Sequence, residues 1–280
     1  MLNPEALDRA YNVRAAIPDH PAIFARWREK SLRAIDDLRS EQDYYYGPSP
    51  AETLDFFPAH RNRAPLLVFV HGGYWRSLDK SDFSFVAPPF VEAGISVAVV
   101  NYGLAPKTRI EEMVQQMLRA GAWLHRHAAD LGIDAERIHV AGHSAGAHLA
   151  AMMAAADWPA WSPDLPPRLV KSVISISGLF DLVPVARAPF LRDDLGLDDE
   201  GAARVSPAGY PPASPVPVLA AVGELESEEF HRQSRGLAAA WDNCPVRLMN
   251  LPGRHHLAAV EALADPAHEL FHATVKLVTR

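Results

Sequence analysis

Short apolar runs divide the chain after residue 60. Five of these runs are continuous rather than alternating, and they are "PLLVFVHGG", "ISVAVVNYG", "RIHVAGHS", "KSVISISGLFD" and "VPVLAAVGE" (residues 65–73, 95–103, 137–144, 171–181 and 216–224). Continuous β-branched runs indicate strands that are covered on both faces. Helical patterns separate the runs, for example over residues 109–132. Strands that alternate with helices predict an α/β fold with a mostly parallel, doubly wound sheet.

The first forty residues have a helical pattern instead. In "DHPAIFARWREKSLRAIDDL" (residues 19–38), Asp19 is a candidate N-cap and Pro21 falls near the first turn. The apolar residues of this segment recur at roughly helical spacing, and they are Ile23, Phe24, Trp27, Leu32 and Ile35. "DYYYG" and "TLDFFP" (residues 43–47 and 53–58) then predict two short strands.

Proline-rich segments mark loops. "DWPAWSPDLPPR" and "SPAGYPPASPVP" (residues 157–168 and 206–217) cannot continue a helix or a central strand. Residues 184–215 carry mixed short helical patterns and predict an insertion over the strand ends. We therefore expect a single domain over residues 1–280, with a small helical cap to which this insertion and the N-terminal helices (about residues 1–40) contribute.

One serine lies at a sharp corner of the predicted fold. Gly142-His143-Ser144-Ala145-Gly146 fits G-x-S-x-G and lies between a predicted strand and the alanine-rich helical pattern "AHLAAMMAAA". So short a pattern also occurs by chance, but a strand before it and a helix after it are the context in which it marks a nucleophile. The turn would place the Ser144 hydroxyl at the N-terminus of the helix, where unpaired N–H groups favour negative charge. Ser144 is therefore the candidate nucleophile.

A glycine-rich strand end offers an oxyanion hole. "HGGYW" (residues 71–75) ends a predicted strand. In folds with a G-x-S-x-G corner, the end of an earlier strand supplies the second backbone N–H that binds the oxyanion. The expected donors are the backbone N–H groups of Gly73 and Ala145, with Gly72 or Tyr74 as further candidates. The side chains that adjoin these donors are candidates for substrate contact, namely Trp75, Tyr74 and His143.

A serine nucleophile also needs a base and an acid. In this architecture the acid follows a later strand and the histidine comes last in the chain. "GELESEE" follows the strand at residues 216–224 and offers Glu224 and Glu226. "GRHHL" follows the predicted strand "VRLMNLPG" and offers His255 and His256.

Together these residues resemble the α/β-hydrolase superfamily, and within it the kynurenine formamidase (arylformamidase) branch, which is related to the hormone-sensitive-lipase-like esterases. The similar segments keep the family's order, and they are "HGGYW", "NYGLAP", "GIDAERIHVAGHSAGAHLAA", "SISGLFDL", "GELESEEFHRQS" and "GRHHL". The resemblance implies Ser144 as nucleophile, His256 as base and Glu226 as acid, where the family often has aspartate. Glu224 and Asp181 are the alternative acids.

The resemblance also implies a function. It indicates a serine hydrolase of tryptophan catabolism that cleaves a small N-formyl arylamine through a formyl-serine intermediate, with N-formylkynurenine as the family's substrate. No metal or organic cofactor is expected. A carboxylesterase acting on short acyl or aryl esters is the first alternative. A non-catalytic hydrolase-fold receptor or scaffold is the second, and an intact nucleophile, base and oxyanion loop argue against it.

Composition and charge narrow the setting. The chain has 280 residues, of which 49% are hydrophobic, and a formal net charge of −7 without a clustered basic stripe, so nucleic acid is not an expected partner. The apolar runs are strand-length or alanine-rich, which predicts no membrane span. A single cysteine, Cys244, and no visible secretory signal favour a cytoplasmic protein with a small-molecule substrate. A homodimer is compatible with the sequence, which does not define the oligomeric state.

Two further features bear on ligands. "HELFH" (residues 268–272) matches the zinc motif H-E-x-x-H, but residues 273–280 offer no third ligand, which would have to be an upstream residue such as Asp265 or Glu261. We therefore predict a packed amphipathic helix over "ALADPAHELFHATVKLV" and no metal. An amino-acid substrate would present a carboxylate to this acidic protein, and the candidate cations for it are Arg76, Arg187 and Arg192.

Overall fold

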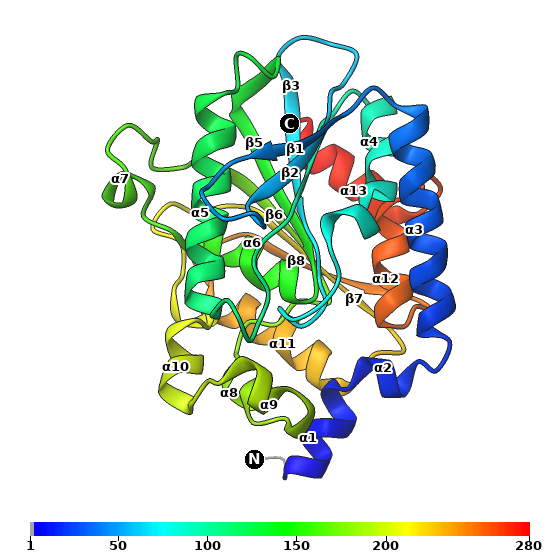
Figure 1. Cartoon of the computed structure of the whole chain (residues 1–280). Coiled ribbons are helices and arrows are strands. Elements are labelled where there is room, and N and C mark those ends of the chain that lie inside the picture. The colour runs from blue at the N-terminus through cyan, green and yellow to red at the C-terminus, as the bar shows by residue number, and fades with distance from the viewer. Residues whose placement is uncertain (1–2) are drawn as a thin grey trace.

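The computed structural model describes residues 3–280. An eight-stranded sheet lies at the centre of the fold (Figure 1). The strands are β1 (Glu41–Tyr45), β2 (Thr53–Phe57), β3 (Ala64–Val70), β4 (Ser96–Val100), β5 (Ile133–His143), β6 (Val170–Ile176), β7 (Val218–Gly223) and β8 (Val246–Leu251). Their spatial order is β1-β2-β4-β3-β5-β6-β7-β8. β2 runs antiparallel to β1 and β4, and the other neighbours are parallel. The predicted α/β fold with a mostly parallel sheet is confirmed.

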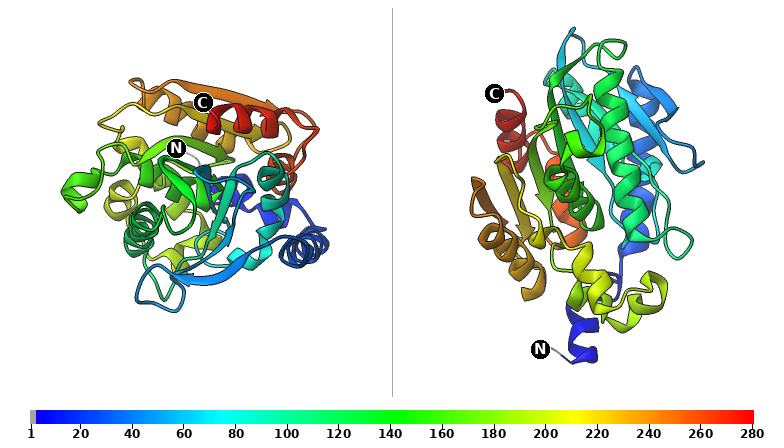
Figure 2. Two further views of the ribbon diagram at one scale, coloured as in Figure 1. Left: turned by 90° about the horizontal axis from the view of Figure 1, so that it is seen from above. Right: turned by 90° about the vertical axis from the view of Figure 1, so that its left-hand side faces the viewer.

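Helices cover both faces of the sheet. They are α1 (Pro4–Tyr11), α2 (Val13–Ala16), α3 (His20–Asp37), α4 (Ala87–Glu92), α5 (Ile110–Arg126), α6 (Ala145–Ala155), α7 (Trp158–Trp161), α8 (Val183–Ala186), α9 (Pro189–Leu195), α10 (Asp199–Arg204), α11 (Glu228–Ala240), α12 (His256–Leu263) and α13 (Glu269–Val278). Short 3₁₀ turns occupy Lys80–Asp82, Ser84–Val86 and Pro207–Gly209. α4, α12 and α13 pack on one face, and α5, α6 and α11 pack on the other (Figures 1 and 2).

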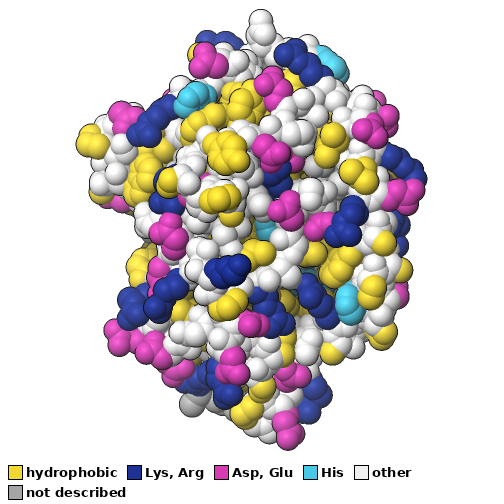
Figure 3. Space-filling model, in the orientation of Figure 1, with side chains coloured by type: hydrophobic (Ala, Val, Ile, Leu, Met, Phe, Trp, Pro, Cys, Tyr) yellow, Lys and Arg dark blue, Asp and Glu magenta, His cyan; other side chains and the backbone are white. Residues whose placement is uncertain are grey.

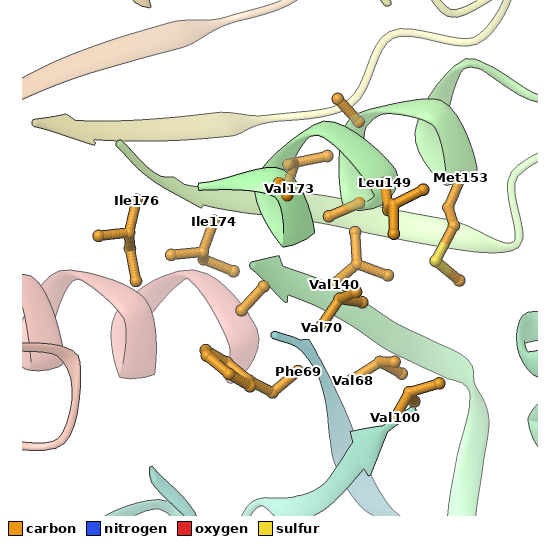
Figure 4. Packing of buried hydrophobic residues seen from close by; sticks show 14 of the residues in the cluster. Val68, Phe69, Val70, Val100, Val140, Leu149, Met153, Val173, Ile174 and Ile176 are labelled. Carbon is orange, nitrogen blue, oxygen red and sulfur yellow. The ribbon is translucent and has the colours of Figure 1, made fainter. Parts of the chain in front are cut away.

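The central strands carry the core, as Figure 4 shows for β3, β5 and β6. Every residue of β3 is buried. Val140 of β5 and Val173 of β6 are also fully buried, and Leu149 and Met153 of α6 pack near them. Full burial of one such side chain stabilises the fold by about 1.5–3 kcal/mol. The strand ends that follow these residues therefore project from a rigid platform.

Some predicted details differ from the structure. Asp19 is the N-cap residue of α3, as predicted, although its side chain makes no capping hydrogen bond. Leu32 is 58% exposed although Ile23 and Trp27 of the same helix are buried. The helix predicted over residues 109–132 ends at Arg126, because the chain must turn before β5 begins. Apolar periodicity therefore identified these helices better than it identified the end of the second one.

Short helices gather over one end of the sheet. The segment 184–215 contains α9, α10 and most of α8 at the lower end of the molecule in Figure 1, where α8 and α9 pack against α1 and α10 packs against α8. α1 also packs against α11, which follows β7 in the chain. The loops after the strands consequently lie between the sheet and these helices.

The surface gives two simple observations. On the face shown in Figure 3, basic and acidic side chains are interspersed. None of the helices within residues 3–280 combines the length and the apolar character that a bilayer crossing requires.

Buried histidines lie at the centre of the fold. His139 of β5 makes a hydrogen bond of 2.7 Å with Ser172 Oγ. In α6, His148 Nδ1 accepts a hydrogen bond from Trp75 Nε1, so that its Nε2–H donates to the carbonyl of Val205 at 2.7 Å. Burial lowers the pKa of both His139 and His148 from 6.5 to about 4, because the charged imidazolium loses its hydration.

These shifts predict acid sensitivity of the fold. The unfolded chain binds more protons than the folded chain between pH 6.5 and about pH 4, so the free energy of unfolding decreases as the pH falls through that window. Each histidine contributes a slope of up to about 1.4 kcal/mol per pH unit. Urea denaturation at pH 7, 6 and 5 should show a smaller slope for His148→Gln than for the wild type. The exposed His60→Gln variant should keep the wild-type slope, and an unchanged slope in His148→Gln would contradict this reading.

Candidate active site

Ser144 occupies a strained turn between β5 and α6. Its backbone has φ 56° and ψ −118°, which is unusual for a residue with a side chain. The Ser144 N–H donates to the carbonyl of Ile176 at 2.8 Å, which anchors the turn to the end of β6. A Cβ on Gly146 would lie 2.0 Å from the carbonyl oxygen of Val70, and one on Gly142 would lie 2.2 Å from that of Gly146. Only glycine fits at these two positions, so the G-x-S-x-G pattern has a steric cause here.

The predicted oxyanion loop lies against this turn. A Cβ on Gly72 would come within 3.2 Å of Ser144 Cβ, so the two segments are in contact. Gly73, Tyr74 and Trp75 all have positive φ (110°, 53° and 56°), and the loop therefore forms a left-handed bend. Within residues 3–280, the N–H groups of Gly73 and Ala145 donate to no backbone carbonyl in the loops, turns and caps. Ala145 is the first residue of α6, so its N–H has no acceptor within the helix.

Glu226 and His256 form a buried pair. Glu226 Oε2 lies 2.6 Å from His256 Nδ1, and the Glu226 side chain has no exposed surface. Glu226 Oε1 accepts from the Gly223 N–H at 2.7 Å and from the Ser177 hydroxyl. A buried carboxylate is tolerable only with such donors, and here both of its oxygens are hydrogen-bonded.

The sequence offered three candidates for the acid that pairs with the histidine, and each has different contacts in the structure. Glu226 contacts His256, as described above. Glu224 Oε2 instead accepts from the Gly253 N–H at 2.7 Å, and Asp181 pairs with Arg232 at 3.1 Å. Only the first arrangement places a carboxylate against the imidazole.

The acid loop and the histidine loop are joined because β7 and β8 are parallel neighbours. The Leu225 N–H donates to the carbonyl of Arg254 at 3.0 Å. A Cβ on Gly223 would lie 2.3 Å from the same carbonyl oxygen. His255 Nδ1 accepts from the Ala258 N–H and caps α12, which leaves His256 as the histidine that faces Glu226.

The turn that carries Ser144 contacts the histidine loop through His143. His143 Nε2 donates to the carbonyl of His256 at 3.0 Å, and the two imidazole rings have centroids 4.7 Å apart. Within residues 3–280, no hydrogen bond joins Ser144 Oγ to the His256 ring itself. The turn that carries Ser144 therefore contacts the loop that carries His256. Proton transfer from Ser144 Oγ to the His256 ring is part of the function proposed below.

The three side chains expected to contact substrate are all buried. His143 packs under His256, and burial holds the pKa of His143 well below its usual value. Trp75 is fully buried and donates to His148, and the Tyr74 hydroxyl donates to the carbonyl of Tyr11. These contacts hold the oxyanion loop in place, so the predicted substrate contacts for Trp75, Tyr74 and His143 gain no support from the geometry.

Sequence patterns predict that the N-terminal helices contribute to a cap, but they do not indicate which residues of these helices contact the site. α1 and α2 cover the site, where the Ser227 hydroxyl donates to the carbonyl of Ala10 and the Tyr11 hydroxyl donates to Glu229 at 2.6 Å. Residues of α1 and α2 line a cavity of about 100 Å³ together with Glu226 and His256. Ser177 was also missed, although the "SISG" segment at the end of β6 could have indicated a polar strand end.

The zinc motif does not form a metal site. His268 is the N-cap of α13, where its Nδ1 accepts from the Leu270 N–H at 3.1 Å. The terminal pattern, predicted as one amphipathic helix, divides into α12 and α13 around Pro266. Across residues 3–280 there is no group of three or more His, Cys, Asp or Glu that could hold a metal ion.

Comparison with known proteins places the chain in a family. Residues 54–239 match the model of the BD-FAE family, and the chain belongs to this family of α/β-hydrolases. The match spans the oxyanion loop, the serine corner and the acid loop. The resemblance to α/β-hydrolases is therefore confirmed.

Several curated proteins are similar to this chain. Kynurenine formamidase of Salmo salar is 31% identical over 83% of this chain and 80% of its own length. That of Danio rerio is 29% identical over 88% and 84%. Esterase LipQ of Mycobacterium tuberculosis is 30% identical over 76% of this chain and 56% of its own length.

Solved structures show the same fold. A protein from Silicibacter sp. TM1040, provisionally described as a thioesterase, superposes with a TM-score of 0.84 at 32% identity over 98% of this chain and 99% of that chain. Esterase B from Lactobacillus rhamnosis has a TM-score of 0.72 at 19% identity, over 94% of this chain and 95% of that chain. The chain is therefore a hydrolase of the α/β fold, of the kynurenine formamidase or esterase type, in a family of serine hydrolases.

The contact between the acid and histidine loops predicts the effect of a single methyl group. Gly223→Ala should push Arg254 and the adjacent histidine loop away from Glu226. We expect kcat for a short p-nitrophenyl ester to fall at least about 100-fold, because a misplacement of about 1 Å costs that much. Gly236→Ala is the matched control, because a Cβ there meets no atom within 4 Å and should leave activity intact. Equal activity of the two variants in steady-state assays would refute the prediction.

Proposed function

We propose that this protein is an arylformamidase, a serine hydrolase that removes the formyl group from a small N-formyl arylamine of the N-formylkynurenine type. The observations that carry the proposal are the buried Glu226–His256 pair, the strained backbone of Ser144, and the contact of His143, the neighbour of Ser144, with His256. The similarity to kynurenine formamidases over more than four fifths of the chain supports the substrate class.

The first half of the proposed reaction forms an acyl-enzyme. Glu226 holds His256 through Nδ1–H, which leaves Nε2 as the base. His256 Nε2 takes the proton of Ser144, and Ser144 Oγ bonds to the formyl carbon. The N–H groups of Gly73 and Ala145 hold the oxyanion, and each such donor contributes roughly 3 to 4 kcal/mol. Catalytic hydrogen bonds often form only when substrate binds. The proposed scheme therefore does not require a hydrogen bond between Ser144 Oγ and His256 Nε2 before substrate binds.

The second half releases the products. His256 returns its proton to the aryl nitrogen as the C–N bond breaks, and the arylamine leaves. Water then attacks the formyl-serine carbon while His256 accepts a proton from that water. Collapse of the second tetrahedral intermediate breaks the bond to Ser144 Oγ, returns the proton to the serine and releases formate. The scheme uses no metal or organic cofactor.

The closed geometry favours a small acyl group. Ser144 is 2% exposed and His256 is 5% exposed. A formyl group is the smallest acyl group that such a site could transfer.

A carboxylesterase is the second candidate function. It is supported by the similarity to esterase LipQ, since the same triad and oxyanion hole would cleave short esters. The ratio of kcat/KM for N-formylkynurenine to kcat/KM for a short p-nitrophenyl ester separates the two. A ratio well above one supports the arylformamidase, and a ratio well below one supports the esterase.

The nucleophile assignment predicts the outcome of a single substitution. Ser144→Ala should lower kcat for every cleaved substrate by about 10⁴-fold or more, because no covalent intermediate can form. The variant should keep its fold by circular dichroism. Retention of most of the activity on formamides and esters would refute the proposed mechanism.

The acid assignment predicts a selective effect among three carboxylates. Glu226→Gln keeps the shape of the side chain but not its charge, so kcat should fall by roughly 10²- to 10⁴-fold. Glu224→Gln and Asp181→Asn are the controls and should change kcat less than about 3-fold, because their partners are Gly253 and Arg232. A larger loss in either control than in Glu226→Gln would transfer the acid role to that residue.

A further inference from the structure

The three arginines that the sequence offered for a substrate carboxylate already have acidic partners. Arg76 Nη1 pairs with Asp194 and donates to the carbonyl of Phe190. Arg187 pairs with Asp199. Arg192 pairs with its neighbour Asp193 at 3.3 Å and lies on the exposed side of α9. A substrate carboxylate would have to compete with an aspartate at each position.

Arg14 on α2 differs from these residues. It is half-buried, and within residues 3–280 it makes no ion pair with a carboxylate. Its Nη2 donates to Ser77 Oγ at 2.6 Å, and its guanidinium lies 5.5 Å from the ring centroid of Phe24. A guanidinium has five N–H donors, and this single hydrogen bond leaves most of them available.

The surroundings of Arg14 make an anionic partner favourable. Burial and the positive charge of Arg76 lower the pKa of Arg14, so the folded protein holds two cations near each other. A partly desolvated cation without a paired anion is unfavourable, and a bound carboxylate would relieve that cost.

Arg14 is also connected to the oxyanion loop. Ser77 Oγ, which accepts from Arg14, donates to the carbonyl of Gly73 at 2.9 Å. Two hydrogen bonds therefore separate the guanidinium from the residue whose N–H would hold the substrate oxyanion. Val13, the residue before Arg14, lines the cavity beside His256. Arg14 itself does not line this cavity, so its connection to the site is the chain through Ser77, on the side of the oxyanion loop.

We infer that Arg14 binds the carboxylate of the substrate and selects aryl formamides that carry an amino-acid side arm over neutral ones. The inference rests on the proposed function, because that function supplies the anionic substrate. The formyl carbonyl would bind at Gly73 and Ala145 while the carboxylate at the far end of the same molecule meets Arg14. The N-terminal helices would then supply substrate selectivity as well as cover.

The test compares charged and neutral substrates on the same variants. The measurement is kcat/KM for N-formylkynurenine and for N-formylaniline with wild type, Arg14→Gln, Arg14→Lys and Arg192→Gln. Arg14→Gln should lose about 10- to 100-fold on N-formylkynurenine, mainly through KM, because hydrogen bonds to charged groups contribute that much. Its kcat/KM on N-formylaniline should stay within about 3-fold, and Arg14→Lys should recover part of the loss. Arg192→Gln should resemble the wild type on both substrates.

Two results would overturn the inference. One is an equal loss on both substrates in Arg14→Gln, which would indicate a structural role for Arg14. The other is no loss on N-formylkynurenine. The ratio of the two rates within one preparation does not depend on the folded fraction, so partial unfolding cannot mimic the expected selectivity.

A second substrate pair separates this inference from the proposed function. If the wild type cleaves neither formamide, the arylformamidase proposal fails. Phenyl acetate and its analogue with a carboxyethyl group on the ring then test Arg14 alone. A selective loss on the carboxylate-bearing ester in Arg14→Gln would support the inference for an esterase, and the absence of selectivity would overturn it.

Discussion

The close approach of α6 to the ends of β3 and β5 is the constraint on which the site depends. With Gly142 and Gly146 at the corner, carbonyl oxygens approach to distances that no Cβ could tolerate, and Ser144 adopts its positive φ. The same packing brings Gly72 against Ser144, so the nucleophile and the oxyanion loop are positioned together. The buried core of β3 and β5 provides the stability that offsets this local strain.

The remaining parts of the site are built on parallel strand ends. β7 and β8 deliver the acid loop and the histidine loop side by side, and the buried carboxylate of Glu226 is satisfied by Gly223, Ser177 and His256. The N-terminal helices then close over these loops through hydrogen bonds made by Tyr11 and Ser227. The result is a nearly sealed nucleophile, which suits a reaction with a very small acyl group.

Local patterns predicted the fold and much of the candidate site, while contacts distant in sequence could not be predicted. Ser144 and its flanking glycines form a contiguous motif with a steric cause, so they could be recognised before the structure. Glu224 and Glu226 stand two residues apart in one loop, and only the side-chain directions distinguish them. The partners of Arg76 and Arg14 lie 118 and 63 residues away, which no periodicity reveals. The division of α12 from α13 differs, because Pro266 is a local signal that a continuous helix cannot pass, and the predicted single helix ran through it.

The central claim is that Ser144, activated by His256 and Glu226, is the nucleophile. The most direct test is to incubate the wild-type protein with a fluorophosphonate and to map the modified residue by peptide mass spectrometry. The account predicts one phosphonyl adduct, on Ser144, with the labelling rate strongly reduced in Glu226→Gln. An adduct on another serine such as Ser177, or no adduct on a folded protein, would contradict it.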